Sequence, residues 1–69
     1  MKPEENLLHQ MTQEVIDAIV GNRMQEAKTK WENTWFYLQE LVDYCTTDED
    51  LVQLKKYDVL LSQLKQKIR

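Results

Sequence analysis

Residues that break helices are almost absent from this chain of 69 residues. Its single proline is residue 3 and its single glycine is residue 21, and these two types most disfavour a helix interior. No segment alternates polar and apolar residues as a half-buried strand does. The sequence therefore predicts an all-α fold, with one small domain over residues 1–69 and no linker or internal repeat.

The first helix is predicted over residues 4–20. Pro3 is a favoured residue of a first helical turn, and Gly21 is expected to end the helix in the left-handed conformation. Asn22 is then expected to cap the next helix, with Gln25 completing a capping box. So short a connection predicts an antiparallel hairpin. The core face of this helix is formed by Leu8, Met11, Val15, Ala18 and Ile19.

The second helix is predicted over residues 23–45 and is the longest, about 34 Å from end to end. Residues at helical spacing on one side of it form the expected core face, namely Met24, Ala27, Trp31, Trp35, Leu38, Val42 and Cys45. Cys45 therefore has the position of a buried structural thiol. It is the only cysteine, so an intramolecular disulfide is excluded and a reducing compartment is expected.

The third helix is predicted over residues 48–68. Thr46 and Glu49 match the threonine-x-x-glutamate pattern of a capping box, and the acidic residues at 48–50 are favourable at a helix N-terminus. The apolar positions that follow are three and four residues apart, the spacing of a helix that packs lengthwise on another. They are Leu54, Tyr57, Leu61, Leu64 and Ile68.

Together these elements predict a three-helix antiparallel arrangement, a helical hairpin followed by a third helix. A domain of this size buries only about 60% of its unfolded surface. With His9 as the only histidine and Cys45 as the only cysteine, no zinc site of Cys and His ligands can be built within one chain. Association remains as a source of buried surface, so we expect a homodimer that completes a larger bundle.

The aromatic residues are concentrated in the second helix, where four of the six fall between positions 31 and 38. Trp31 and Trp35 belong to its core face, whereas Tyr37 forms a second apolar row with Leu41 and Tyr44. Two hypotheses are open for that row. It packs inside a core that surrounds the second helix on two sides, or it forms an intermolecular interface, where tyrosine is equally suitable.

Phe36 has a different environment, because polar and acidic residues such as Asn33, Glu40 and Asp43 surround it on the helix. An isolated aromatic residue near charges is typical of an interface anchor. We interpret Val52 and Val59 as scattered surface residues. The predicted protein-interface residues are Phe36, Tyr37, Leu41 and Tyr44.

No residue pattern indicates catalysis, a cofactor or a metal. His9 is expected to be an exposed helix residue, and the acidic residues at helix starts are explained by capping. A single glycine cannot form a phosphate-binding loop. We therefore expect a protein that is not an enzyme, with no catalytic, cofactor-binding or metal-binding residue.

Basic residues gather on the third helix, at Lys55, Lys56, Lys65, Lys67 and Arg69. Because only 9 basic residues stand against 12 acidic ones in the whole chain, a solvated face explains them better than a phosphate-binding surface. An alternative function nevertheless follows from them. A dimer that brings two such helices together would be a nucleic-acid-associated regulator.

The preferred prediction is a small cytosolic protein–protein interaction module, an adaptor, chaperone-like or regulatory protein. It would self-associate and bind a partner protein through the aromatic surface of the second helix. No apolar run is long enough to span a membrane and the first residues lack the apolar core of a signal peptide, which gives the cytoplasm as the expected location. The partner and the pathway do not follow from the sequence.

In outline, a short helix, a long helix and a closing helix resemble the small helical chaperones of bacterial flagellar and type III secretion systems. Small phage or plasmid regulators of this size resemble it equally. The resemblance is one of architecture over the whole chain, and it implies a helical protein-binding function without indicating which residues perform it.

Overall fold

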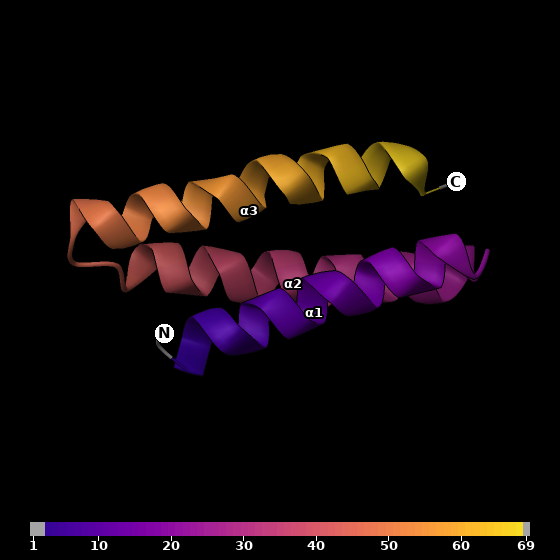
Figure 1. Ribbon diagram of the computed structural model, residues 1–69, viewed down its shortest axis with the longest axis horizontal. Coiled ribbons are helices and arrows are strands. Elements are labelled where there is room, and N and C mark those ends of the chain that lie inside the picture. Colours follow the sequence, from indigo (N-terminus) through magenta and orange to yellow (C-terminus); the bar gives the residue numbers. More distant parts are fainter. Residues whose placement is uncertain (1–2, 69) are drawn as a thin grey trace.

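Three helices make up the computed structural model, which describes the backbone of residues 3–68 and the side chains of residues 6–68. They are α1 (Pro3–Val20), α2 (Met24–Asp43) and α3 (Asp48–Lys67), and no strand occurs between residues 3 and 68. The all-α prediction is confirmed. Figure 1 shows the helices along the longest dimension, with the chain reversing at each connection, so α1 and α3 run the same way.

The left-handed residue between α1 and α2 is Asn22, with a φ of 59°, so the prediction that Gly21 has this role was wrong. The amide of Asn22 donates to the carbonyl of Ile19 (3.0 Å), and that of Arg23 donates to the carbonyl of Ala18 (2.8 Å). These two bonds form a Schellman motif, in which asparagine is the usual substitute for glycine. The helix itself ends at Val20, as predicted, and only the left-handed residue lies one position later than predicted.

The start of α2 also differs from the prediction. Because Asn22 completes the turn that ends α1, Arg23 occupies the capping position, and no side chain there accepts a hydrogen bond from the helix. The expected capping box of Asn22 and Gln25 is therefore wrong. Instead, the Arg23 Nε lies 2.9 Å from a carboxylate oxygen of Glu26, both exposed, and such a surface pair stabilises a helix only slightly.

The start of α3 is capped by Thr47, not by Thr46 as predicted. The Thr47 hydroxyl accepts a hydrogen bond of 3.2 Å from the amide of Asp50, and its backbone is extended, with φ −126° and ψ 152°. That extended conformation is the one that a capping residue requires. A capping box of Thr46 and Glu49 is thus wrong by one residue.

Cys45 lies outside α2, which ends at Asp43 and not at residue 45. It is partly buried against the core, with its sulfur 3.1 Å from the carbonyl oxygen of Thr47 in the connection to α3. The thiol therefore packs at the end of the bundle, where the turn brings it, and not within the helical core face that was predicted.

The core is a single cluster to which all three helices contribute. Its largest buried members are Leu8, Val15, Trp31, Leu38, Leu54, Leu61 and Leu64. All seven belong to the predicted core faces. Ala18 and Ala27 are also fully buried, and small side chains of this kind let helices approach closely.

Two buried polar residues complete the core, and the sequence pattern did not indicate them. Thr12 and Thr34 have exposed fractions of 2% and 1%. Each hydroxyl donates to the main-chain carbonyl four residues earlier, Leu8 at 2.8 Å and Lys30 at 2.7 Å. The hydroxyls are therefore satisfied within their own helices, and burial leaves no unpaired polar group.

Among the residues that the structure describes, no helix combines the length and the apolar character needed to cross a membrane.

Candidate protein interface

Trp31 makes three kinds of contact, two of which join α2 to α3. Its indole Nε1 donates a hydrogen bond of 2.6 Å to the main-chain carbonyl of Leu61. Its ring stacks on that of Trp35, with centroids 5.4 Å apart and planes inclined by 9°. The Lys65 ammonium lies 4.9 Å from the Trp31 ring centroid, close enough for a cation–π attraction. Trp31 is thereby fixed in place, with 8% of its surface exposed.

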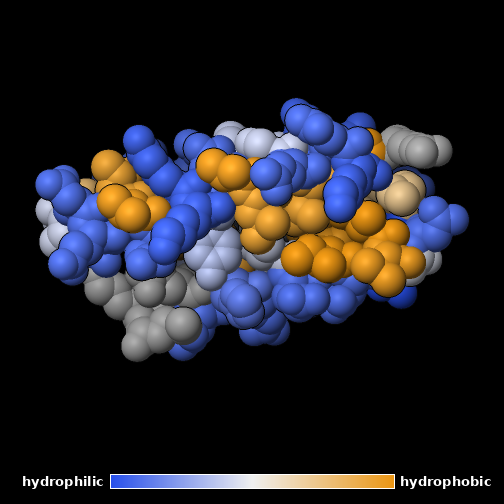
Figure 2. Space-filling view, turned by 45° about the horizontal axis from the view of Figure 1, so that its top comes forward, coloured by the Kyte–Doolittle hydropathy of each residue, from blue (hydrophilic) through white to orange (hydrophobic). Residues whose placement is uncertain are grey.

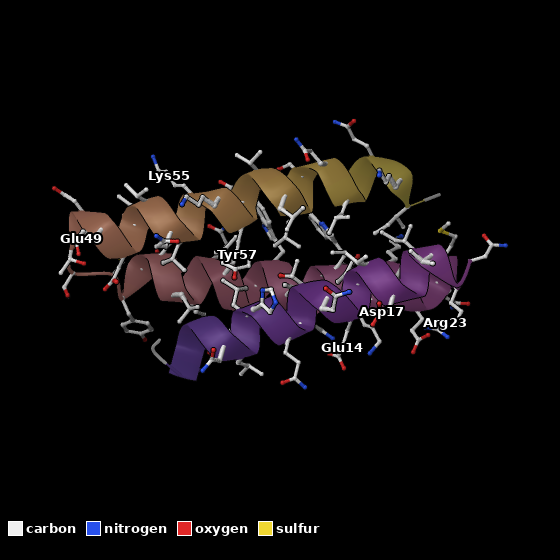
Figure 3. The ribbon with its side chains drawn as sticks, viewed as in Figure 1. Glu14, Asp17, Arg23, Glu49, Lys55 and Tyr57 are labelled. Atoms are coloured by element: carbon white, nitrogen blue, oxygen red, sulfur yellow. The ribbon has the colours of Figure 1, made fainter. Side chains whose placement is uncertain are left out.

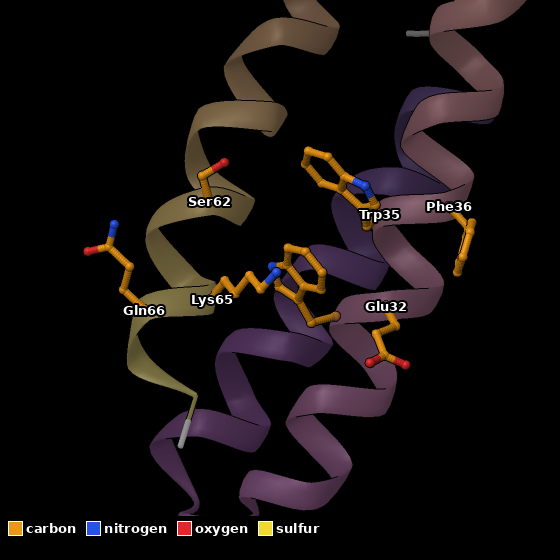
Figure 4. A pocket seen from close by; sticks show the side chains of 7 residues that line it. Glu32, Trp35, Phe36, Ser62, Lys65 and Gln66 are labelled. Atoms are coloured by element: carbon orange, nitrogen blue, oxygen red, sulfur yellow. The ribbon is translucent and has the colours of Figure 1, made fainter.

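An open groove of about 840 Å³ follows this contact along the surface between α2 and α3. It is hereafter called the aromatic groove. Figure 4 shows Glu32, Trp35 and Phe36 on α2, opposite Ser62, Lys65 and Gln66 on α3. Trp35 is partly exposed and Phe36 is 69% exposed. The groove therefore has an aromatic floor and a polar rim, with one acidic and one basic side chain.

This composition suits binding. An apolar side chain of a partner that packs on Trp35 would be removed from water. Because stacking on Trp31 already fixes the Trp35 ring, little side-chain freedom would be lost on binding. The polar rim can donate and accept hydrogen bonds around such a side chain. Within the described part of the chain, no three His, Cys, Asp or Glu residues are grouped so that they could hold a metal ion.

Tyr37 and Leu41, two of the predicted interface residues, are partly buried and pack against the core cluster. They share a side of α2 with Lys30, whose ammonium lies 3.9 Å from a carboxylate oxygen of Glu14 on α1. Tyr37 and Leu41 follow Lys30 by seven and eleven positions, which returns them to nearly the same side of the helix. This row therefore faces α1, while the tryptophan row faces α3, so α2 uses two apolar rows for two neighbours.

Phe36 and Tyr44, the other two predicted interface residues, are exposed by 69% and 82%. Phe36 borders the aromatic groove. Tyr44 lies at the end of α2, where its backbone amide bonds to the Glu40 carbonyl. The four predicted residues are thus not brought together as one surface.

The α3 wall of the groove, formed by Ser62, Lys65 and Gln66, was missed by the sequence analysis. Lys65 follows the buried Leu61 by one helical turn, which places it beside the core of α3. That spacing alone could not indicate Trp31 as its neighbour, because the register between α2 and α3 is a tertiary property.

On the side of α3 that approaches α1, the Tyr57 hydroxyl lies 3.4 Å from Nδ1 of the exposed His9. Figure 3 shows Tyr57 between the two helices. His9 therefore has a neighbour in the tertiary structure, which its sequence surroundings did not indicate. The contact fixes which residues of α1 and α3 lie at the same level.

Comparison of the chain with models of protein families, with curated proteins and with solved structures finds no match.

Proposed function

We propose that this protein is a small cytosolic protein–protein interaction module that self-associates and binds a partner protein through the aromatic groove. In this proposal, the antiparallel three-helix unit is one half of a larger bundle formed by dimerisation. The partner places an apolar side chain or a short apolar stripe of a helix against Trp35, with Phe36 covering its flank. An adaptor, chaperone-like or regulatory role fits this chemistry.

The observation that carries the proposal is the incomplete burial of a rigid aromatic pair. Trp31 is buried and hydrogen-bonded, whereas Trp35, stacked on it, is left partly open to water beside the exposed Phe36. Large aromatic residues in a fixed, partly dry site are typical of the residues that dominate binding energy at protein interfaces. A helix with residues at i and i+4 on one face would fit such a groove.

The alternative, a nucleic-acid-associated regulator that uses α3 in a dimer, has less support. Lys55 and Lys56 are exposed, but the Lys65 ammonium lies over the Trp31 ring. Phosphate binding would compete with that contact. Nucleic-acid binding that weakens steeply with salt and is lost when these three lysines are neutralised would favour the alternative.

Site-specific photo-crosslinking in the native cells tests the proposal. A photoreactive phenylalanine analogue replaces Phe36 in one variant and Val59 in a matched control, because Val59 is also exposed, by 58%, but is not a groove residue. We expect a discrete protein adduct from position 36 that is absent from position 59. The adduct should disappear when Trp35→Ser is added.

Purification of the crosslinked protein then gives a binding measurement with defined components. Trp35→Ser should weaken that binding at least tenfold while the helical circular dichroism is retained. Adducts that are the same from both positions, or binding that is unchanged by Trp35→Ser, would contradict the assignment of the groove.

A further inference from the structure

A second apolar surface lies on the opposite side of α3 from the aromatic groove, and it is separate from the partner site proposed above. Figure 2 shows apolar side chains gathered over α3 and the helix beside it, toward the end of the molecule where α3 finishes. Val20 there is 81% exposed, and Ile16, Ile19 and Leu60 are partly buried. Together with the core residue Leu64, which is 7% exposed, these residues are here called the α1/α3 face.

The His9–Tyr57 contact shows that these residues belong to one face. Ile16 and Val20 follow His9 by seven and eleven residues, so they lie on the same side of α1 as His9. Leu60 and Leu64 follow Tyr57 by three and seven residues and lie on its side of α3. The apolar side chains of both helices therefore border the same surface.

The contact also gives the register. Figure 1 shows that α1 and α3 run in the same direction, and each helix rises by about 1.5 Å per residue. The His9 and Tyr57 side chains meet, so their backbones lie within about one helical turn of the same level, and so do those of Ile16 and Leu64. The apolar part of the face thus occupies the C-terminal halves of both helices, while its other half holds the polar His9 and Tyr57 pair.

We propose that a second copy of this chain covers the α1/α3 face, with the two-fold axis parallel to the helices. This assignment rests on the self-association in the proposed function and names the surface that performs it. With the axis in that direction, the C-terminal halves of the two copies meet, and apolar surface covers apolar surface. A two-fold axis across the helices, with the copies overlapping over their full length, would instead place the apolar half of one copy on the polar half of the other.

Charge favours the same arrangement. Asp17 lies at the edge of α1 remote from α3 (Figure 3), where its carboxylate accepts a hydrogen bond of 3.1 Å from the side-chain amide of Gln13 on the same helix. Lys67 is exposed and follows Leu60 by seven residues, so it lies on the side of α3 that carries Leu60, within about one helical turn of the level of Asp17. The parallel axis places α1 of one copy on α3 of the other, so each Asp17 meets a Lys67. The transverse axis would bring the two α1 edges together.

The size of the molecule sets an upper bound on the contact. Its two longer axes measure 37 Å and 20 Å, an outline of roughly 700 Å², so a stable dimer of approximately 800 Å² per partner would need the polar half of the α1/α3 face as well as its apolar half. Because α1 and α3 provide two helices of 18 and 20 residues, the dimer would be a six-helix bundle. The aromatic grooves would remain open on its outside.

Sedimentation equilibrium of Val20→Lys, compared with Val59→Lys, tests the assignment. Val20 is exposed and ends α1, where a positive charge favours the helix, so the variant should fold. We expect Val20→Lys to raise the dimer dissociation constant at least tenfold. Val59→Lys, at a valine outside the face, should leave it within twofold of the wild-type value.

A charge exchange tests the orientation. Asp17→Lys alone should weaken the dimer several-fold, because each copy then faces Lys67 with a like charge, and adding Lys67→Asp should restore it. Asp43→Lys, at an exposed carboxylate on α2, is the matched control and should have no effect. Absence of rescue in the double variant would overturn the parallel axis.

The outcomes separate this assignment from the proposed function. A dimer that survives Val20→Lys but dissociates with Phe36→Ser would overturn the α1/α3 face while keeping self-association. A wild-type protein that is monomeric at all concentrations would overturn both the face and self-association. Partner binding at the aromatic groove is decided independently by crosslinking from position 36.

Discussion

The Trp31 indole and the Leu61 carbonyl form a hydrogen bond of 2.6 Å between side chain and main chain, across 30 positions of sequence. It ties α2 to a fixed point on α3. The same ring stacks on Trp35 and lies beneath the Lys65 ammonium. Trp31 therefore positions the floor of the aromatic groove while belonging to the core itself.

Trp31→Phe should lower the free energy of unfolding by about 1–3 kcal/mol, because the hydrogen bond to Leu61 is lost and the smaller ring leaves a gap. Trp35→Phe is the matched control. Trp35 is partly exposed, so replacing its indole by a smaller ring should lower the free energy of unfolding by less. Urea denaturation followed by circular dichroism measures both, and an equal cost for the two variants would contradict the structural role given to Trp31.

Asn22→Ala should destabilise the protein by about 1 kcal/mol, since alanine has no ready access to the left-handed backbone that Asn22 adopts. Asn22→Gly should be neutral or slightly stabilising. Gly21→Ala should cost less than Asn22→Ala, because the added methyl group meets mainly the flexible end of Arg23 and one carbonyl at 3.3 Å. Thermal melting of the three variants checks this order, and the reverse order would show that Gly21 has the left-handed role.

Thr47→Ala should destabilise α3 by about 1 kcal/mol through loss of the bond to the Asp50 amide. Thr46→Ala should change the free energy of unfolding by less than about 0.5 kcal/mol, as expected for an exposed residue without such a bond. Hydrogen exchange of the first amides of α3 provides a local measurement. Faster exchange at Asp50 in the Thr47 variant alone is the expected result.

Tyr37→Ala should lower the free energy of unfolding by about 2 kcal/mol or more, because its ring packs against the core. Phe36→Ala should change it by less than about 0.5 kcal/mol, since 69% of Phe36 is exposed. Equilibrium unfolding in guanidinium chloride measures both. A larger cost for Phe36 than for Tyr37 would contradict the division of the aromatic residues between interface and core.

The helices and their buried faces were predictable because both depend on local sequence. Apolar spacing places Leu8, Leu38 and Leu61 in the core without any tertiary information, and all three are fully buried. The ends of the helices were less predictable. Thr46 and Thr47 differ by one position, and Asn22 can either cap a helix or end one, so the choice depends on how the chain turns between helices.

The candidate site was predictable only in part, for a tertiary reason. The second apolar row of α2 has the same spacing whether it faces another molecule or α1, and the Lys30–Glu14 contact that identifies its neighbour joins residues of different helices. Phe36 could be singled out because no helix of the chain covers it. Lys65 could not be linked to Trp31, since that contact depends on the register of α2 against α3.

Self-association is the central claim that a single measurement tests most directly. Light scattering gives the molar mass of the wild-type protein as it elutes from a sizing column, over a hundredfold range of loading concentration. We predict that the mass rises to twice the 8.3 kDa of one chain and stays there at high concentration. A mass that remains at 8.3 kDa throughout would contradict the account.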